Sequence, residues 1–325
     1  MSCYSHILNK LADGHFHSGE VLAAEQGVTR AAIWKQLKKI ESLGIAIDSV
    51  RGKGYRLQQT LDLLDIEKIR SSLPDNVLTE IEKIELFADI DSTNRYLMDA
   101  CKTATGVQVC LAESQSHGRG RRGRPWVSPF ASNIYLSISW QYTTGPMSLS
   151  GLSLALGIAV MRVLSAYVAG NIGLKWPNDI YANGKKLGGI LVEFSGDVSG
   201  PCQIVAGLGL NVRMPKQWDK DIDQPWIDLH SLAGQQTPGR NRLTAELVKQ
   251  MIAVLRDYPE HGFAQYQKEW HQWDFVRGKA VELCFPTHKK QGIVKGVNPE
   301  GALLLETASG IETFNSGEIS LKIQS

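Results

Sequence analysis

The chain has 325 residues, more than one ordinary domain usually contains, and its length predicts two or three domains. Hydrophobic residues make up 43% and charged residues 21% of the chain, proportions that exclude disorder over most of its length. The formal net charge of +2 is too small to indicate a nucleic-acid partner by itself. Residues 1–60, however, hold eight Lys and Arg against five Asp and Glu, so we expect any basic binding surface near the N-terminus.

Residues 1–65 have the pattern of a winged helix-turn-helix domain. Ser18 starts one predicted helix, Gly27 ends it, and Thr29 caps a second. The second helix carries apolar residues at helical spacing, namely Ile33, Leu37, Ile40 and Leu43. The basic, Gly-rich segment 51–56 then joins two short strands and predicts a β-wing. Such a domain places its second helix in the major groove of DNA and its wing on the phosphates.

Residues 66–270 alternate between strand and helix patterns and predict a mixed α/β domain. The expected strands are 107–111, 134–138, 172–176, 189–194 and 203–210, and Asn183-Gly184 marks a hairpin turn. The most apolar segment, 149–168, contains Arg162 and several Gly and Ser, so it predicts a buried helix and no membrane span. A polar stretch, 213–240, is expected to be irregular, and 243–255 has the pattern of an amphipathic helix.

Residues 271–325 contain only short strand patterns separated by Gly, Pro and Asn. The expected strands are 280–284, 291–297, 302–306, 312–314 and 319–323. Five strands in so short a stretch predict a small β-barrel. The predicted fold class is therefore α+β with three domains, 1–65, 66–270 and 271–325.

The five cysteines, at positions 3, 101, 110, 202 and 284, show no C-x-x-C spacing. They predict neither a disulfide framework nor a thiolate zinc site, and the histidines show no metal-binding spacing either. The first twenty residues carry charges and histidines where a signal peptide needs an apolar segment. We therefore expect a protein of the reducing cytoplasm, with no metal-ligand cluster of its own and no membrane partner.

The most unusual string is 118–124, in which four arginines are interspersed with glycines between two expected strands. Glycine allows the backbone to approach a ligand closely, and the arginine fork donates paired hydrogen bonds to carboxylate and phosphate. The string therefore predicts an anion-binding loop. The alternative is a solvated basic loop or an arginine-rich RNA-binding segment, although segments of the latter kind are usually long and terminal.

Two further strings hold candidate ligand-binding groups. Asp91-Ser92-Thr93-Asn94 precedes a predicted helix, so its hydroxyl and amide groups either cap that helix or form neutral hydrogen bonds with a polar ligand. Segments 175–179 and 186–190 flank the Asn-Gly hairpin at a strand end, where ligands bind in α/β sheets. The residue pattern does not choose among Lys175, Lys185 and Lys186. Neither G-x-x-x-x-G-K-[ST] nor a strand followed by G-x-G-x-x-G occurs, so any nucleotide must be bound by another arrangement.

Together these strings resemble one family. Five motifs stand in the order and spacing of the biotin–protein ligases: D-S-T-N at 91–94, A-E-S-Q-x-x-G-R-G-R-R-G-R-x-W at 112–126, K-W-P-N-D at 175–179, K-L-x-G-I-L-V-E at 186–193 and G-L-G-L-N at 207–211. With a winged helix in front, the whole chain resembles the bifunctional ligases that also repress the biotin operon. A lipoate–protein ligase, related in fold, would show a different arginine-glycine motif that ends in His-Asp.

The resemblance implies a reaction, a fold and partners. Biotin and MgATP would give biotinyl-5′-AMP and pyrophosphate, and a lysine of a biotin carboxyl carrier protein would then take the biotin. The C-terminal barrel would be SH3-like. The N-terminal domain would bind operator DNA as a repressor, with biotinyl-5′-AMP as the corepressor that induces a homodimer. We expect segments 115–126 and 213–226 to be poorly anchored without ligand and to be ordered by the adenylate, which would favour the dimer.

The resemblance also implies roles for individual residues. Biotin would be bound by Ser92, Thr93, Asn94, Gln115, Arg119, Gly120, Arg121 and Lys186. ATP and the adenylate would be bound by Arg121, Trp126, Lys175, Asn178, Asn211 and Trp226. Arg119 and Lys186 would neutralise the reacting anions. Asp179 would orient Lys186, bind Mg²⁺ or help to deprotonate the acceptor amine.

In the N-terminal domain, the expected DNA contacts are Gly19, Thr29, Arg30, Ala31, Ala32, Lys35, Gln36, Lys38, Arg51, Lys53 and Arg56. Trp34 departs from the pattern, because it stands where a polar base-reading residue is expected. Two alternatives are a ligase whose N-terminal domain only supports the fold, and a regulator whose ligase-like domain only senses a ligand. The complete arginine-glycine loop with Lys186 argues against the second, and the basic charge of the winged helix argues against the first.

Overall fold

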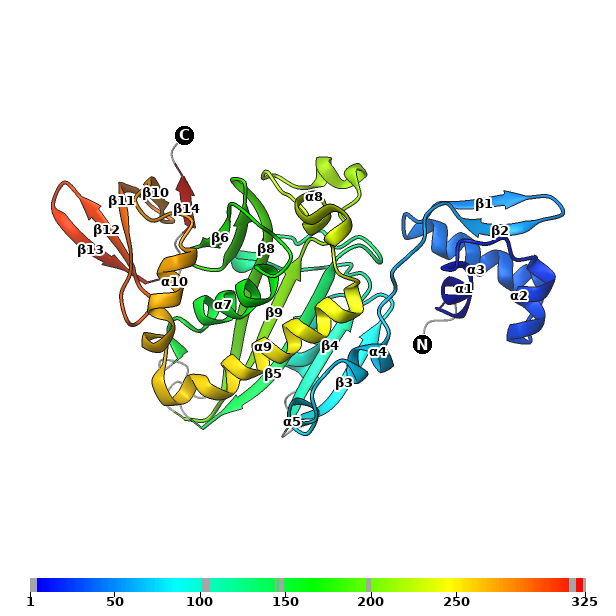
Figure 1. Cartoon of the computed structure of the whole chain (residues 1–325), viewed down its shortest axis with the longest axis horizontal. Helices are drawn as coiled ribbons and strands as arrows, with labels where there is room; N and C mark the ends of the chain where they lie inside the picture. Colours follow the sequence, from blue (N-terminus) through cyan, green and yellow to red (C-terminus); the bar gives the residue numbers. More distant parts are fainter. Residues whose placement is uncertain are drawn as a thin grey trace.

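The computed structural model describes residues 5–100, 106–143, 145, 149–196, 200–315 and 320–323. Three sheets in these residues divide the chain into three parts, with the N-terminal part at one end of the long axis and the C-terminal part at the other (Figure 1). This organisation matches the predicted α+β class, while the domain boundaries near residues 65 and 270 stay predictions. Cys3 and Cys101 lie outside the described residues.

The N-terminal part is a helix-turn-helix followed by a two-stranded wing. Its elements are α1 (Ser5–Leu11), α2 (Gly19–Gln26), α3 (Arg30–Ser42), β1 (Ile47–Val50) and β2 (Gly54–Leu57). The Ser18 hydroxyl accepts a hydrogen bond from a backbone amide of α2, and Gly27 ends that helix in the left-handed conformation. The Thr29 hydroxyl caps α3 in the same way. The predicted caps and the predicted wing are therefore confirmed.

The wing is fastened to the segment before α2. His17 pairs with Tyr55 as a single-residue bridge beside β2. A Cβ atom added at Gly54 would lie 2.0 Å from the carbonyl oxygen of His17, and the φ angle of Gly54 is +105°. Only glycine fits this position, so the Gly-rich turn of the wing is required by the packing of the domain.

Residues 62–65 tie the N-terminal part to the central part. The Arg240 guanidinium donates to the carbonyl oxygen of Asp62, and the backbone amide of Arg240 donates to the Asp62 carboxylate. Glu113 accepts a hydrogen bond from the amide of Leu64 and forms an ion pair with Arg240, with 2.8 Å between Oε2 and Nη1. The connecting segment is therefore held by side chains of the central part.

The central part is built on a seven-stranded mixed sheet. Its strands are β3 (Ile81–Phe87), β4 (Val107–Ala112), β5 (Ile134–Tyr142), β6 (Ile172–Lys175), β7 (Asp179–Ala182), β8 (Lys185–Gly196) and β9 (Cys202–Leu210). The strand order is β3-β4-β5-β9-β8-β7-β6, in which only β3 and β4 run parallel. The five predicted strands are confirmed, and β3 is an additional strand that the sequence analysis did not predict.

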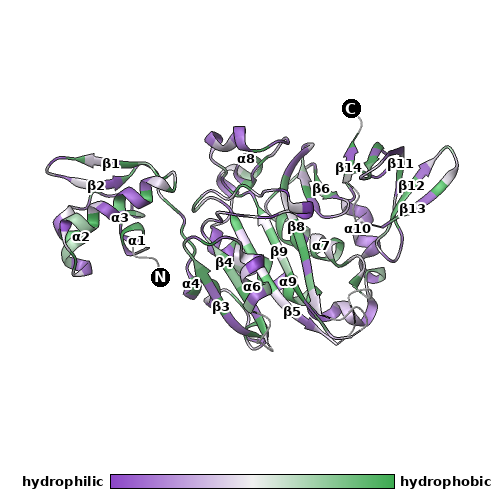
Figure 2. Cartoon of the chain, turned by 180° about the vertical axis from the view of Figure 1, so that it is seen from behind, coloured by the Kyte–Doolittle hydropathy of each residue, from purple (hydrophilic) through white to green (hydrophobic). Residues whose placement is uncertain are grey.

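Helices cover both faces of this sheet. They are α4 (Ile66–Ser71), α5 (Asp75–Leu78), α6 (Thr93–Ala100), α7 (Leu152–Leu164), α8 (Leu229–Ala233), α9 (Arg240–His261) and α10 (Gln267–Trp273). Helices α7 and α9 pack together over one face (Figure 1), and α6 lies on the other (Figure 2). Most of α7 is buried, as its apolar sequence predicts. Among the described residues, no helix combines the length and the apolar character needed to cross a membrane.

The stretch 213–240 is more ordered than the sequence predicts. It contains a 3₁₀ turn at Lys216–Asp221 and the helix α8. The Asp228 carboxylate accepts hydrogen bonds from the amides of Met214 and Ser231, and so caps α8 and fixes the segment before it. The prediction of irregular structure is wrong at this point, because one buried Asp accepts hydrogen bonds both from the first turn of α8 and from the distant amide of Met214.

The C-terminal part is an antiparallel sheet. Its strands are β10 (Ala280–Cys284), β11 (Lys289–Val297), β12 (Leu303–Thr307), β13 (Gly310–Phe314) and β14 (Ser320–Ile323), in the order β13-β12-β11-β10-β14. The five predicted strands are confirmed in the described residues, and Ile319, where the last one was expected to start, lies outside them. The indole of Trp176 donates to the carbonyl oxygen of Gly301, which joins this sheet to the central part.

Candidate functional site

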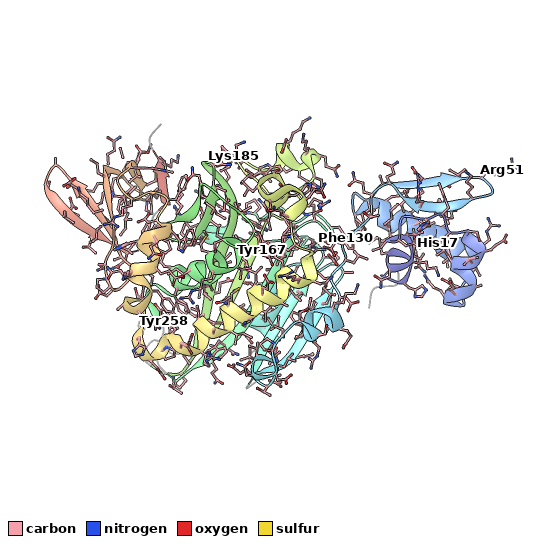
Figure 3. All side chains as sticks on the ribbon, in the orientation of Figure 1. His17, Arg51, Phe130, Tyr167, Lys185 and Tyr258 are labelled. Atoms are coloured by element: carbon pink, nitrogen blue, oxygen red, sulfur yellow. The ribbon has the colours of Figure 1, made fainter. Side chains whose placement is uncertain are left out.

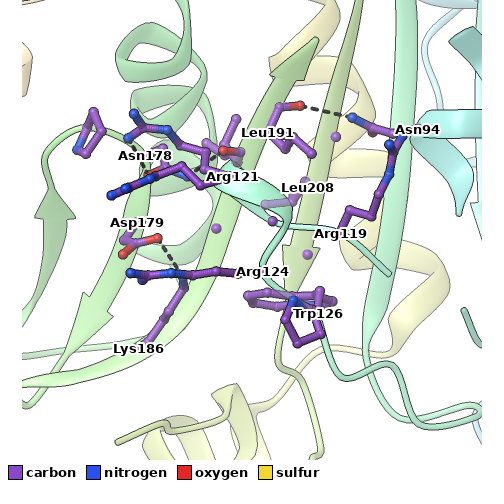
Figure 4. Close-up of a pocket in the computed structure, with 18 of the residues that line it drawn as sticks. Asn94, Arg119, Arg121, Arg124, Trp126, Asn178, Asp179, Lys186, Leu191 and Leu208 are labelled. Carbon is purple, nitrogen blue, oxygen red and sulfur yellow. Dashed lines mark hydrogen bonds and ion pairs between the residues drawn. The ribbon is translucent and has the colours of Figure 1, made fainter. Parts of the chain in front are cut away.

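A pocket opens in the central part beside the N-terminus of α6 and the arginine-glycine loop (Figure 4). Its cavity volume is about 140 Å³. The predicted ligand-binding residues that line it are Ser92, Thr93, Asn94, Gln115, Arg119, Gly120, Arg121, Trp126, Lys175, Asn178, Asp179 and Lys186. The fold thus brings motifs that are far apart in the sequence to one place.

A second pocket, of about 650 Å³, adjoins the first. Trp126, Lys175 and Lys186 line both pockets. The two remaining predicted adenylate residues, Asn211 and Trp226, line only the second one. The first pocket therefore holds the predicted biotin residues, and the adjoining pocket holds Asn211 and Trp226. The two pockets share the side chains of Trp126, Lys175 and Lys186.

The arginine-glycine loop is a small hairpin. The Trp126 amide donates to the Gly118 carbonyl oxygen at 2.8 Å, and the Gly120 amide donates to the Arg124 carbonyl oxygen at 2.7 Å. Arg122, at the tip, adopts a left-handed conformation with a φ angle of 60°. These hydrogen bonds define the shape of the hairpin, while the ordering of residues 115–126 by the adenylate stays a prediction.

A cluster of neutral groups forms one side of the pocket. The side-chain oxygen of Gln115 accepts a hydrogen bond from the Thr93 amide at 2.9 Å. The hydroxyl of Ser137, on β5, lies 2.7 Å from the Thr93 hydroxyl and 2.6 Å from Oδ1 of Asn94. The Asn94 amide in turn donates to the Glu193 carboxylate at 2.8 Å. These groups fix one another's orientation and suit a polar, uncharged part of a ligand.

The residues of the D-S-T-N motif belong to this cluster, and only one long hydrogen bond supports a role as a helix cap. Helix α6 begins at Thr93, and the Ser92 hydroxyl is 3.4 Å from the amide of Arg95, a long distance for a capping hydrogen bond. Ser92, Thr93 and Asn94 are all buried and line the pocket. The structure therefore places the three residues at the pocket, while their contacts with a ligand stay a prediction.

Arg121 and Lys186 lie across the pocket from Asn94, whereas Arg119 lies beside Asn94 (Figure 4). Nζ of Lys186 lies 2.7 Å from Oδ1 of Asp179 and 5.4 Å from the centre of the Trp126 ring. The Lys186 side chain is only 15% exposed, whereas Lys185, at the hairpin turn, is exposed (Figure 3). The structure thus makes the choice that the sequence left open: Lys186 and Lys175 line the pocket, and Lys185 does not.

Burial alters the protonation behaviour of these cations. Burial lowers the pKa of Lys175, and the nearby Asp179 carboxylate opposes this effect in part. The Lys175 ammonium donates to the Tyr181 hydroxyl at 3.1 Å, and burial raises the pKa of Tyr181 to about 12. Burial also lowers the pKa of the Arg121 guanidinium. Charges that are partly removed from water in this way interact more strongly with an anionic ligand than surface charges do.

The glycines of G-L-G-L-N lie on β9 and make room for side chains of the pocket. A Cβ atom at Gly207 would lie 2.0 Å from Oδ1 of Asn94, and one at Gly209 would lie 2.5 Å from the Trp126 ring. Neither contact is possible, so both positions require glycine. The glycines of the motif therefore belong to strand β9, against which the side chains of Asn94 and Trp126 pack. The motif is not a dinucleotide-binding loop.

Three contributing residues were not predicted as site residues. Arg124 lines both pockets, and Glu193 binds Asn94 and also lies 3.4 Å from Arg119. Both belong to motifs that the sequence analysis quoted, so a signal for them was present. Ser137 had no such signal, because it stands in an ordinary apolar strand pattern and reaches the site only through the pairing of β5 with its neighbours.

The described residues contain no group of three or more His, Cys, Asp or Glu side chains that could hold a metal ion. Mg²⁺ that is bound to ATP needs only one or two protein carboxylates, since phosphate oxygens and water supply its other ligands. Asp179 lines the pocket and fits this requirement.

The predicted DNA-binding residues lie on α3 and the wing. Arg30, Ala31, Lys35 and Lys38 are exposed on α3, and Lys53 is exposed in the wing. Arg51 lies at the far tip of the wing (Figure 3). These side chains form a basic surface at the end of the molecule, as the charge distribution predicts.

Most of the predicted DNA contacts also have partners within the domain. Arg30 and Lys38 form exposed ion pairs with Glu20 and Glu41. Thr29 caps α3, where Ala32 is half-buried, and Gln36 donates to a side chain of α2. Arg56 forms an ion pair with Asp48 at 2.7 Å. Gly19 is buried beside the Tyr55 ring, which leaves it little surface to offer DNA. Gly19 therefore has a packing role, and its predicted DNA contact stays a prediction.

Three family models match the chain. They are the HTH domain over residues 5–56, the Biotin/lipoate A/B protein ligase family over residues 86–211, and the Biotin protein ligase C terminal domain over residues 277–322. Each match falls on one of the three structural parts.

Curated proteins and solved structures are similar over most of the chain. The chain is 40% identical to the Bifunctional ligase/repressor BirA of Salmonella typhimurium, over 97% of this chain and 96% of that protein. Its identity to the protein of the same name from Escherichia coli is 39%, with the same coverage. The structure resembles that of the biotin protein ligase from Aquifex aeolicus in complex with biotin and ATP, with a TM-score of 0.64 and 27% identity over 75% of this chain and 100% of that one. The chain therefore belongs to the family of bifunctional biotin ligases and repressors.

Proposed function

We propose that this protein activates biotin with ATP, transfers it to a lysine of a biotin carboxyl carrier protein, and represses transcription by binding operator DNA. One observation carries the first activity: a neutral hydrogen-bonding cluster and the half-buried cations Arg121 and Lys186 face each other across one pocket. Biotin has a polar, uncharged head and an anionic carboxylate, which match these two sides. The adjoining pocket gives the nucleotide a place beside the carboxylate.

The proposed residue roles follow this division. Ser92, Thr93, Asn94 and Gln115 would hold the biotin head. The groups that would contact the adenylate are Gly120, Arg121, Trp126, Lys175, Asn178, Asn211 and Trp226. Arg119 and Lys186 would lie at the carboxylate and the α-phosphate.

In the first step a biotin carboxylate oxygen attacks the α-phosphorus of ATP, and the bond from this phosphorus to the bridging oxygen of the β-phosphate breaks, so that pyrophosphate leaves. Both reactants are anions. Arg119 and Lys186 would therefore act by neutralising charge and positioning the reactants. In the second step the amine of the acceptor lysine attacks the carbonyl carbon of biotinyl-5′-AMP, AMP leaves, and the nitrogen loses a proton.

Asp179 is best assigned to positioning Lys186, because its carboxylate lies 2.7 Å from Nζ and both side chains are largely buried. Mg²⁺ would enter with ATP and supply charge neutralisation at the phosphates, with Asp179 as the carboxylate able to approach it. Cys110 and Cys284 are free thiols, which accords with the cytoplasmic location that we propose.

The regulatory half of the proposal rests on the basic surface of α3 and the wing. One winged helix offers few phosphate contacts, so tight and specific binding requires two copies on a two-fold operator. We infer that the protein forms a homodimer when biotinyl-5′-AMP is bound, and that this dimer is the form that binds the operator.

Two measurements test the proposal. The full chain is incubated with biotin, MgATP and a carrier domain, and the domain should gain biotin at its acceptor lysine, whereas a carrier with Arg at that position should not. Sedimentation should show a monomer alone and a dimer with biotin and ATP together. An unmodified carrier would refute the ligase, and an unchanged monomer at tens of micromolar protein would refute the proposed dimer.

A further inference from the structure

Trp34 is a large apolar side chain on the surface of the helix expected to enter DNA. It is 54% exposed and stands at the fifth position of α3. The helix does not need it for folding, since the core side of α3 is formed by Ile33, Leu37 and Ile40. An exposed tryptophan on a surface otherwise rich in charge is a candidate binding residue.

The neighbours of Trp34 define the kind of partner that this surface suits. Arg30 lies one turn before it and Lys38 one turn after it, and Nζ of Lys38 is 5.9 Å from the centre of the Trp34 ring. Each of these two cations is in an exposed ion pair, Arg30 with Glu20 and Lys38 with Glu41, and exposed pairs of this kind are weak enough to be exchanged for a phosphate. Lys35, next in the chain, is exposed too. A single apolar ring among cations matches a polyanion that carries an isolated apolar group, whereas a protein interface would offer a larger apolar area around it.

The major groove of DNA has these properties. Phosphates line it, and the C5-methyl group of thymine is the apolar group that its base edges present. Residues in the N-terminal half of a recognition helix reach those edges. Ala31, three residues before Trp34, is small enough to let the helix approach the bases closely.

We propose that Trp34 reads a thymine methyl group in the operator, in place of a hydrogen bond from a polar residue at this position. The proposal rests on the DNA binding proposed above and adds to it a specificity-determining residue. Burying one methyl group corresponds to about a fourfold change in affinity, from about 0.8 kcal/mol per buried carbon.

The test replaces thymine by uracil, which lacks only this methyl group. A duplex is first selected from a random duplex library by the full-length protein with biotin and MgATP. The selected duplex is then remade with deoxyuridine at each thymidine in turn, and its dissociation constant is measured at constant salt. Wild-type protein should lose about fourfold affinity at one thymine of each half-site.

Trp34→Ala should lose sensitivity to uracil at that thymine and keep the sensitivity at other positions. Val21→Ala is the matched control, since Val21 is an exposed apolar residue of α2, and its uracil profile should equal that of the wild type. Where Trp34→Ala binds weakly, the profiles of all variants are compared at lower salt, at which phosphate contacts are stronger. Retained sensitivity to uracil at the other positions shows that the N-terminal part of each variant is folded, and unchanged transfer of biotin to the carrier domain shows the same for the central part.

Identical uracil profiles for Trp34→Ala and the wild type would overturn the inference and leave the proposed function intact. If in addition Trp34→Ala alone fails to form the dimer with biotin and ATP, Trp34 contacts protein and not DNA. Failure of the wild type to enrich any duplex would overturn both the operator binding and the inference, and is therefore distinguishable from the first outcome.

Discussion

Nζ of Lys186 lies 2.7 Å from Oδ1 of Asp179, and both side chains are less than one-fifth exposed. The pairing of β7 with β8 creates this contact, since the two residues belong to adjacent strands. The Asp179 carboxylate balances the positive charge of Lys186 until an anionic ligand enters the pocket. A ligand carboxylate or phosphate that enters the pocket meets a cation that is already in position.

Replacing Lys186 should therefore impair adenylation more than folding. Lys186→Ala is expected to lower the rate of biotin-dependent pyrophosphate exchange by about 10²–10³-fold, the loss typical of one contact to a developing charge. Lys185→Ala is the control, because Lys185 precedes it in the same hairpin and is exposed. Equal rates for the two variants would contradict the assignment of Lys186.

The buried pair Arg240–Glu113 should matter for stability. The two side chains are 3% and 6% exposed, so Arg240→Met would leave the Glu113 charge buried without its partner. Breaking such a pair costs about 3–5 kcal/mol. Arg242→Ala removes an exposed pair with Glu246 one turn apart, and should leave the unfolding midpoint almost unchanged. Urea unfolding compares the two, and midpoints lowered by the same amount would show that burial of the pair has no special effect.

Lys175 should give the ATP-dependent reaction an alkaline limit. Because burial lowers its pKa, Lys175 loses its charge at a lower pH than an ordinary lysine as the pH rises. Binding of phosphate should weaken over the same interval, so kcat/KM for ATP should fall there. Lys175→Arg keeps its charge and should move this fall to higher pH, whereas Lys185→Arg should not. Superimposable alkaline profiles for wild type and Lys175→Arg would mean that Lys175 is not the titrating group.

Much of this structure could be predicted because its signals are local. The caps at Ser18, Gly27 and Thr29 depend on a few neighbouring residues, and so do the turns between the C-terminal strands. The motifs that line the pocket could be found for a different reason, since their order and spacing resemble a known family. Neither source gives distances, and the contact between Lys186 and Asp179 comes from the structure.

What could not be predicted depends on pairing between distant segments. The residue pattern alone does not distinguish Lys185 from Lys186, and only the family resemblance favours Lys186. The physical reason comes from the fold: adjacent residues of a strand point to opposite faces, so the register of β7 with β8 decides which one enters the pocket. The Arg240–Glu113 ion pair joins residues that are far apart in the chain, and no local sequence pattern predicts it. The edge strand β3 carries charged residues among its apolar ones, which obscured its pattern.

The wing should contribute to DNA affinity without selecting sequence. Arg51→Ala is expected to weaken binding to all duplexes by a similar factor and to reduce the slope of log K against log salt by about 1, as loss of one phosphate contact does. Lys249→Ala, which removes an exposed charge from α9 in the central part, should leave the slope unchanged. A loss confined to one selected duplex would instead indicate that Arg51 reads bases.

Pyrophosphate exchange tests most directly whether the pocket activates biotin. The full chain is incubated with ATP and labelled pyrophosphate, and biotin is compared with lipoate and octanoate. Octanoate has the carboxylate but no polar head, so it leaves the cluster of Thr93, Asn94 and Gln115 unpaired. A site built to hydrogen-bond its substrate rejects such an analogue by about 10⁴-fold. We predict that biotin alone supports rapid exchange, and equal exchange with octanoate or lipoate, or none with biotin, would contradict the account.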